Sequence, residues 1–166
     1  LADEATQTCS VTMLAAHAVP SGMERADWVR GACTELIPET ARQGLADAVD
    51  VYVEDIAFGI EDLEAIAAAA LQAGLALRVH ADQLGPSGAA EAAAALGARS
   101  ADHLNHVSPD GIAALGRGET AAVLLPASTF TLRAAPAPVA ALRDAGAALA
   151  IASDLNPGTS PISSMP

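Results

Sequence analysis

The 166-residue sequence contains no lysine, and all eight of its basic residues are arginine. This absence excludes mechanisms that need an active-site lysine, namely a Schiff base to pyridoxal phosphate, a P-loop lysine and a carbamylated lysine that bridges two metals. The formal net charge is −12. Because nucleic acids and anionic membranes are bound through basic patches, neither is an expected partner.

Aromatic residues make up only 2% of the chain, but apolar residues reach 52%, which is enough for the core of one domain. No apolar run approaches the roughly 18–20 residues of a membrane-spanning helix. The two cysteines, Cys9 and Cys33, are too few for a disulfide framework, and residues 1–4 do not resemble a signal peptide. We therefore expect reduced thiols and a cytoplasmic protein.

Short apolar runs recur along the chain and alternate with alanine-rich stretches. The runs span residues 10–16, 48–53, 75–80, 120–125 and 147–152, with a weaker one at 100–104. They are nearly continuous in hydrophobicity, which is typical of parallel strands that are buried on both faces.

The stretches between the runs have helical patterns with recognisable ends. The expected helices span residues 25–42, 61–73, 88–96, 109–115 and 139–145. Ser87 and Ser108 are expected N-caps, Gly74 ends one helix, and a break is expected near Pro38. The alternation predicts an α/β fold, either a doubly wound sheet or part of a (β/α)₈ barrel. No glycine-rich phosphate motif follows a run, so a nucleotide-binding sheet has little support.

Unusual polar residues fall at the carboxyl ends of the apolar runs. They are His17, His80 with Asp82, Asp102 with His103, and Asp154 with Asn156. In a parallel α/β barrel, the carboxyl ends of the strands and the loops after them form the active-site face. We therefore expect these residues to gather at one site.

The residue types at this predicted site suit metal chemistry. Imidazole and carboxylate together are ligands for zinc or iron, and His80 and Asp154 are the best candidates. His103 is suited to moving protons, because the ordinary pKa of histidine, about 6.5, lies close to working pH. Asp102 directly precedes His103 in a strand, so we expect it to point to the other face and to be structural.

The neighbouring polar residues allow more than one interpretation. Asp82 is open between a supporting and a direct role. Glu54 and Asp55 could hydrogen-bond a metal ligand, but a solvated loop is the favoured interpretation, as it is for His106. In the loop of residues 154–161, a glycine flanked by small hydroxyl residues can expose backbone N–H groups to an anion, and an ordinary proline-rich turn is the alternative.

Five motifs taken together resemble the imidazolonepropionases, a family of the amidohydrolase superfamily that acts in histidine breakdown. They are HAVP at residues 17–20, HADQL at 80–84, SADHL at 100–104, VLLP at 123–126 and DLNPGTSP at 154–161. The resemblance covers nearly the whole chain. It implies a metal-bearing (β/α)₈ barrel in which residues 1–166 are the C-terminal part, strands three to eight with their helices. Strands one and two and the family's small β-sandwich are absent.

The resemblance also implies an activity and a role for each matching residue. The family hydrolyses the ring C–N bond of the small molecule 4-imidazolone-5-propanoate to N-formimino-L-glutamate. His80 and Asp154 would hold one Zn²⁺, Fe²⁺ or Fe³⁺ ion, and His103 would assist the attacking water. The implied substrate-binding residues are His17, Gln83, Asn156, Gly158 and Thr159.

One departure from the family bears on this interpretation. The chain has no His-x-His pair, which supplies two further metal ligands in the family. Two ligands should hold zinc weakly, and an unclosed barrel leaves two open strand edges. We therefore expect the 166 residues alone to be inactive and poor in metal, or to pair with a second copy as a homodimer.

Two other functions stay open at this point. One is a related amidohydrolase that deaminates a nitrogen heterocycle, and the other is a non-catalytic structural fragment. Gln83 argues against the deaminase. Deaminases of the superfamily commonly carry glutamate at this position, and an amide cannot shuttle a proton as glutamate does.

Overall fold

The computed structural model describes residues 6–164, so residues 1–4, used above to predict the cellular location, lie outside the described residues. Six parallel strands form one sheet in the order β1-β2-β3-β4-β5-β6. Their bounds are Thr12–Ala16 (β1), Ala48–Val53 (β2), Ala76–Ala81 (β3), Ser100–His103 (β4), Ala121–Leu124 (β5) and Leu149–Ile151 (β6). Each strand pairs with its neighbours in sequence, as in a (β/α)₈ barrel. All six apolar runs are confirmed as strands.

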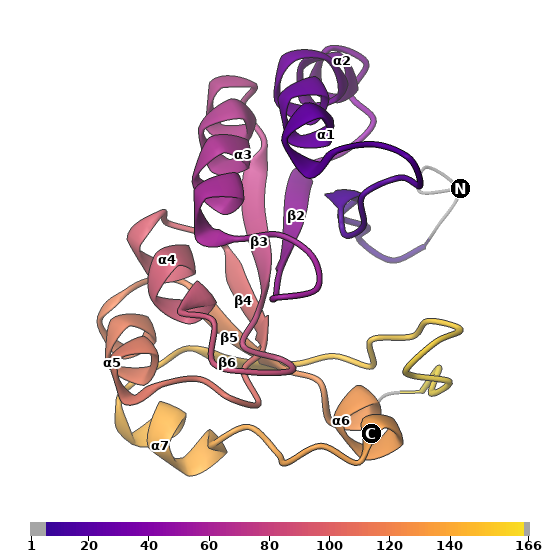
Figure 1. Ribbon diagram of the computed structural model, residues 1–166. Helices are drawn as coiled ribbons and strands as arrows, with labels where there is room; N and C mark the ends of the chain where they lie inside the picture. Colours follow the sequence, from indigo (N-terminus) through magenta and orange to yellow (C-terminus); the bar gives the residue numbers. More distant parts are fainter. Residues whose placement is uncertain (1–5, 165–166) are drawn as a thin grey trace.

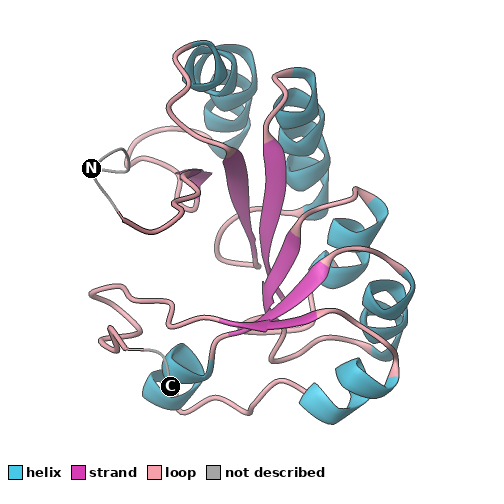
Figure 2. Ribbon diagram, turned by 180° about the vertical axis from the view of Figure 1, so that it is seen from behind, coloured by secondary structure: helices cyan, strands magenta, loops and turns pink. Residues whose placement is uncertain are grey.

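Helices lie between successive strands, and most of them cover one side of the curved sheet, while α6 lies on the other side near the C-terminal segment (Figure 1 and Figure 2). Their bounds are Arg25–Gly31 (α1), Ala32–Leu36 (η2, a π-helical turn), Ile37–Arg42 (α2), Ile60–Gln72 (α3), Ala89–Ala95 (α4), Pro109–Arg117 (α5), Pro126–Leu132 (α6) and Val139–Asp144 (α7). None of the helices in the described part of the chain has the length and apolar character to cross a membrane. The chain is thus a partial (β/α)₈ barrel, as predicted.

The two faces of the sheet differ, and the prediction that the strands are buried on both faces holds for β2 and β4 but not for β3 or β6. The face toward the helices is a dry core, in which Val49, Val51 and Val79 are almost fully buried. The opposite face carries partly exposed polar side chains, among them Arg78 and His80 on β3. In a closed barrel this face would be packed in the interior. Here the six strands do not close a ring, so water reaches it.

The helix ends agree with the sequence at one serine and differ at the other. The Ser108 hydroxyl accepts a hydrogen bond from the Gly111 N–H at 2.9 Å and caps α5, as expected. Ser87 does not cap α4, because the N-cap is Gly88, in the left-handed conformation (φ 76°). The capping acceptor is instead the Asp82 carboxylate, which receives the N–H groups of Ser87, Gly88 and Ala90. The sequence left a supporting and a direct role open for Asp82, and these hydrogen bonds favour the supporting role.

The long helical region near the N-terminus is not broken at Pro38. Helices α1 and α2 are joined by the π-helical turn η2, which ends just before this proline. Proline has no N–H to donate, so the hydrogen bonding changes locally from i→i+4 to i→i+5 instead of stopping. Helix α6 was not expected from the sequence.

Close packing of α5 against α7 depends on Gly116. A Cβ atom at this position would lie 2.3 Å from the carbonyl oxygen of Ala145 and 2.9 Å from its carbonyl carbon. Because these are backbone atoms, Gly116→Ala is expected to lower the free energy of unfolding by about 1–3 kcal/mol, measured by urea denaturation. Gly31→Ala is the matched control: it lies in α1, nothing is within 4 Å of its Cβ, and alanine there should be neutral or slightly stabilising. Equal urea denaturation midpoints for Gly116→Ala and Gly31→Ala would contradict the close packing of α5 against α7.

Candidate active site

A cavity of about 540 Å³ lies at the carboxyl ends of the strands. Seven of the eight residues predicted for the site line it, namely His17, His80, Gln83, His103, Asp154, Asn156 and Thr159. The eighth, Gly158, belongs to the same loop as Asn156 but does not line the cavity. The fold thus brings together residues that are far apart in the sequence, and the role of each stays a prediction.

Three strand ends turn sharply at this cavity. Asp82, His103 and Asp154 follow or end β3, β4 and β6, and each has a positive φ, of 51°, 78° and 53°. A left-handed backbone costs a residue with a side chain about 1–2 kcal/mol, and such strain concentrates at functional sites. Of the five non-glycine residues with positive φ in the described part of the chain, these three are polar residues that the sequence placed at the site, and the other two are Leu104 and Arg133.

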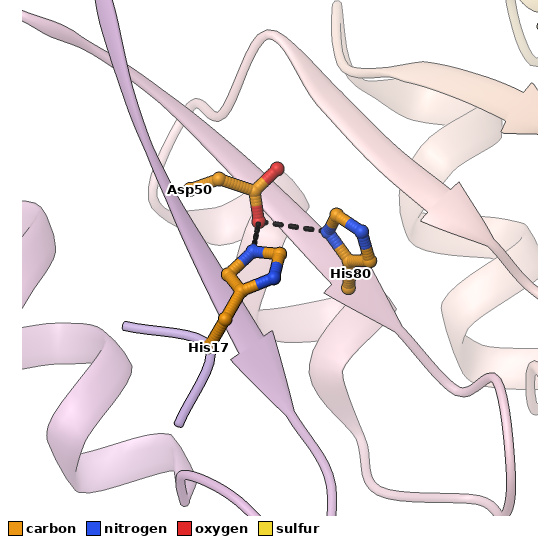
Figure 3. A group of neighbouring side chains, drawn as sticks. All are labelled: His17, Asp50 and His80. Atoms are coloured by element: carbon orange, nitrogen blue, oxygen red, sulfur yellow. Dashed lines mark hydrogen bonds and ion pairs between the residues drawn. The ribbon is translucent and has the colours of Figure 1, made fainter. Parts of the chain in front are cut away.

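The centre of the site is a buried carboxylate between two imidazoles (Figure 3). Asp50 Oδ1 lies 2.8 Å from His80 Nδ1 and 3.3 Å from His17 Nε2, and Asp50 is only 3% exposed. Burial alone would raise the pKa of Asp50, but the hydrogen bonds from His17 and His80 outweigh it and lower this pKa to about 2. Asp50 is therefore an anion throughout the neutral range.

Sequence reasoning missed Asp50, because it lies inside a strand and not at its end. Its signal was a lone carboxylate within the otherwise apolar run of residues 48–53. A charged residue that interrupts a buried strand needs a partner, since an unpaired buried charge is costly.

The same three residues form the candidate metal group. Among the described residues, His17, Asp50 and His80 are the set of three whose ligand atoms all lie within 4.8 Å of one another. Asp154, the predicted partner ligand of His80, is not in this set. Burial would lower the pKa of His80, but the hydrogen bond and charge of Asp50, with the charges of Asp102 and Asp154, raise it. Asp154 therefore acts on His80 through its charge.

His103 is a neutral base beside His80. Its ring centroid lies 5.1 Å from that of His80, and its Nδ1 lies 3.5 Å from the Ser128 hydroxyl. Burial, together with the positive charge of His80 when protonated, lowers the pKa of His103 to about 3. At neutral pH the ring is therefore neutral, but so low a pKa makes it a weak base in the metal-free chain. The pKa near 6.5 on which its predicted role in moving protons was based is not found here.

The prediction that Asp102 points away from the site is wrong. Asp102 lies directly opposite His80 in the register of β3 and β4, so both side chains share the inner face. Its Oδ1 is buried without a hydrogen-bond partner among the described residues. Burial and the charge of Asp50 raise the pKa of Asp102 to about 6. His103 also reaches the cavity, because its positive φ ends the alternation of the strand.

The interpretation of Glu54 as a solvated loop residue is wrong too. Glu54 is buried, and its Oε1 accepts the N–H groups of Gln83 at 2.7 Å and Leu84 at 2.9 Å. It thereby fixes the backbone from which the Gln83 side chain enters the cavity. Asp55 and His106 are exposed, as expected.

The loop after β6 is held by Asn156. Its Oδ1 accepts the N–H groups of Gly158 at 2.9 Å and Thr159 at 2.7 Å, and its Nδ2 donates to the Asp154 carbonyl and the Thr159 hydroxyl. The N–H groups that the sequence offered to an anion are therefore occupied by an asparagine-capped turn.

Among curated proteins, this chain has relatives that it matches over part of their own length. No family model matches the chain. The imidazolonepropionase of Acidiphilium cryptum (strain JF-5) is 50% identical over 157 residues, which are 94% of this chain and 39% of that protein. The imidazolonepropionase of Stenotrophomonas maltophilia (strain R551-3) is 48% identical over 154 residues, 92% of this chain and 38% of that protein. The chain thus spans about two-fifths of the length of these relatives.

Solved structures share the fold at low sequence identity. An adenosine deaminase from Xanthomonas campestris with bound zinc superimposes with a TM-score of 0.62 at 18% identity, over 86% of this chain and 36% of that one. A Xaa-Pro dipeptidase with bound methionine gives a TM-score of 0.57 at 15% identity, over 89% of this chain and 46% of that one. These similarities show the partial barrel and carry no statement about substrate.

Proposed function

We propose that this chain, which is homologous to part of the imidazolonepropionases over nearly its whole length, supplies the catalytic face of such an enzyme. The whole protein would hydrolyse the ring C–N bond of 4-imidazolone-5-propanoate to N-formimino-L-glutamate, a step of histidine degradation. The observation that carries the proposal is the cavity at the strand ends, which is lined by seven of the eight predicted residues, all except Gly158.

The donor set in this cavity fits one zinc or iron ion. Imidazole and carboxylate accept either metal, and His80 with Asp154 would hold it, as the family resemblance implies. A bound ion of this kind would supply Lewis-acid polarisation of the scissile amide. Two ligands hold zinc weakly, so we keep the expectation that the 166 residues alone bind it poorly and are inactive.

The residues of the chain would divide the remaining work. His103 would take the proton from the attacking water and later give it to the leaving nitrogen, the role that the family resemblance implies. Gln83 would hydrogen-bond the imidazolone from the backbone that Glu54 fixes. His17, Asn156 and Thr159 would contact the rest of the substrate, and Gly158, whose N–H is held by Asn156, would shape the loop that carries them.

Deamination of a nitrogen heterocycle is the competing reaction. It needs a group that moves protons at the position of Gln83, and a carboxamide cannot do so. The zinc-bearing adenosine deaminase of similar fold is only 18% identical, so its name does not favour this alternative.

We further propose that the 166 residues, when they stand alone, pair with a second copy as a homodimer, and that the chain works in the cytoplasm. In the described part of the chain, β1 and β6 each have one strand partner, so each leaves an edge open, and Leu149 and Ile151 are exposed on β6. A second copy could cover these edges. The two cysteines are free thiols, which suits a reducing compartment.

The direct test compares substrates with the whole protein that contains this chain. Supplied with zinc or iron, it is expected to consume 4-imidazolone-5-propanoate, to form N-formimino-L-glutamate and to release no ammonia from cytosine or guanine. Product formation is followed by chromatography and ammonia by a coupled assay. Ammonia release without ring opening would establish the deaminase, and inactivity on all three would favour the structural fragment.

A further inference from the structure

We infer that Asp50 is a positioning residue that sets the hydrogen-bonding direction of both His17 and His80, so that each ring presents an unprotonated nitrogen to the cavity. The use of these nitrogens in binding rests on the proposed function, whereas their unprotonated state follows from the geometry alone. Its basis is the geometry of one buried carboxylate oxygen shared by two imidazoles.

The first step concerns where the two protons lie. A neutral imidazole carries one N–H, and a carboxylate can only accept hydrogen bonds. Oδ1 of Asp50 faces Nδ1 of His80 at 2.8 Å and Nε2 of His17 at 3.3 Å. Each ring must therefore place its proton on the nitrogen that faces Asp50.

The second step concerns the nitrogens that remain. Figure 3 shows Nε2 of His80 and Nδ1 of His17 turned away from Asp50. Neither nitrogen has a hydrogen-bond partner among the described residues. The buried side-chain atoms without a partner in this part of the chain are Arg78 Nε, Glu91 Oε2 and Asp102 Oδ1. The two nitrogens are not among them, so they are not buried. Both rings line the cavity. The two lone pairs are thus open to whatever the cavity binds.

The third step concerns what these lone pairs can bind. A histidine that ligates a metal usually donates its other N–H to a carboxylate, which fixes the ring and raises its basicity. His80 has this arrangement, so its Nε2 is the ligand atom. His17 cannot donate a hydrogen bond from Nδ1, so in this tautomer it accepts one from an N–H or O–H donor, and it cannot bind a substrate carboxylate through this atom.

The first test reads the tautomers directly in the unsubstituted chain. Because the chain has only four histidines, long-range proton–nitrogen correlation NMR of the labelled, metal-free chain at slightly alkaline pH can assign each ring. We expect the Nδ1–H form for His80 and the Nε2–H form for His17. The opposite tautomer at either ring would overturn the inference, whatever the enzyme's substrate proves to be.

The second test adds zinc and an Asp50→Asn variant. Zinc should shift the Nε2 signal of His80 while its Nδ1–H persists, and loss of that N–H would overturn the inference, because the ion would then lie among His17, Asp50 and His80. In Asp50→Asn, the zinc affinity of the whole protein that contains this chain, measured by titration, should fall about 10–100-fold, and in the chain both rings should become tautomer mixtures.

Asp102→Asn is the matched control for this variant. It makes the same change on the same face of the next strand, and Asp102 has no hydrogen bond to an imidazole. Its tautomers should stay as in the parent chain, and its zinc affinity should change less than threefold. Equal losses of zinc affinity in Asp50→Asn and Asp102→Asn would mean that only the negative charge of these carboxylates matters. That result would overturn the positioning role of Asp50.

Discussion

Replacing His80 by alanine is expected to abolish both metal binding and ring opening in the whole protein. Loss of a residue that merely orients a metal ligand costs about 10–100-fold in affinity or activity, so loss of the ligand itself should lower kcat/KM by on the order of 10³-fold or more. His80 also forms the hydrogen bond to the buried Asp50 carboxylate, which would lose its closer partner. Metal content by atomic absorption and turnover of 4-imidazolone-5-propanoate measure the two losses together.

His106→Ala is the control for this change. The side chain of His106 is exposed, and its backbone N–H donates a hydrogen bond to the Asp82 carbonyl at 2.8 Å. Its removal should leave metal content and kcat/KM within a factor of two of the parent. Full activity and full metal content in His80→Ala would instead show that the chain is a structural piece and that the proposed active site is wrong.

Replacing Asp102 by asparagine is expected to stabilise the metal-free chain at neutral pH. Burial and the charge of Asp50 raise the pKa of Asp102 from 3.8 to about 6, so the folded chain resists ionising this carboxyl. Between these two values the folded state binds more protons than the unfolded state, and stability falls as pH rises. Above pH 6 the full penalty applies, on the order of 1–3 kcal/mol, and asparagine removes it.

The pH dependence separates this cause from others. Urea denaturation in EDTA should show little difference between Asp102→Asn and the parent at pH 3.5, a growing difference through pH 5, and the largest difference above pH 6. Because a bound cation would itself change the pKa of a nearby carboxyl, the comparison uses metal-free protein. A gain of equal size at pH 3.5 and pH 7.5 would mean that it comes from packing and not from ionisation.

The strands and most of the site could be predicted because their signals are local. The run of residues 48–53 became β2 without a change of bounds, since six consecutive positions favour a buried strand. His17, His80, His103 and Asp154 could be placed together because the carboxyl ends of parallel strands meet at one edge of the sheet.

The remaining parts depend on which way side chains point across several strands. Asp50 and Asp102 were missed or misplaced because the face of a strand that looks into the barrel is set by register and curvature, which no single strand reveals. Glu54 was missed because its two hydrogen-bond donors lie about thirty positions later in the chain. These are long-range pairings, whereas composition and periodicity report on short windows.

The order of the strands in the sheet also implies that the site forms later than most of the fold. Because every strand pairs with the strand before it in sequence, each β–α unit can dock onto the preceding one as it leaves the ribosome. His17, however, follows the first strand and Asp154 the last, at opposite edges of the sheet. The pocket can therefore be completed only when the last strand has been synthesised and has docked, so the appearance of ligand binding should lag behind the gain of secondary structure during refolding.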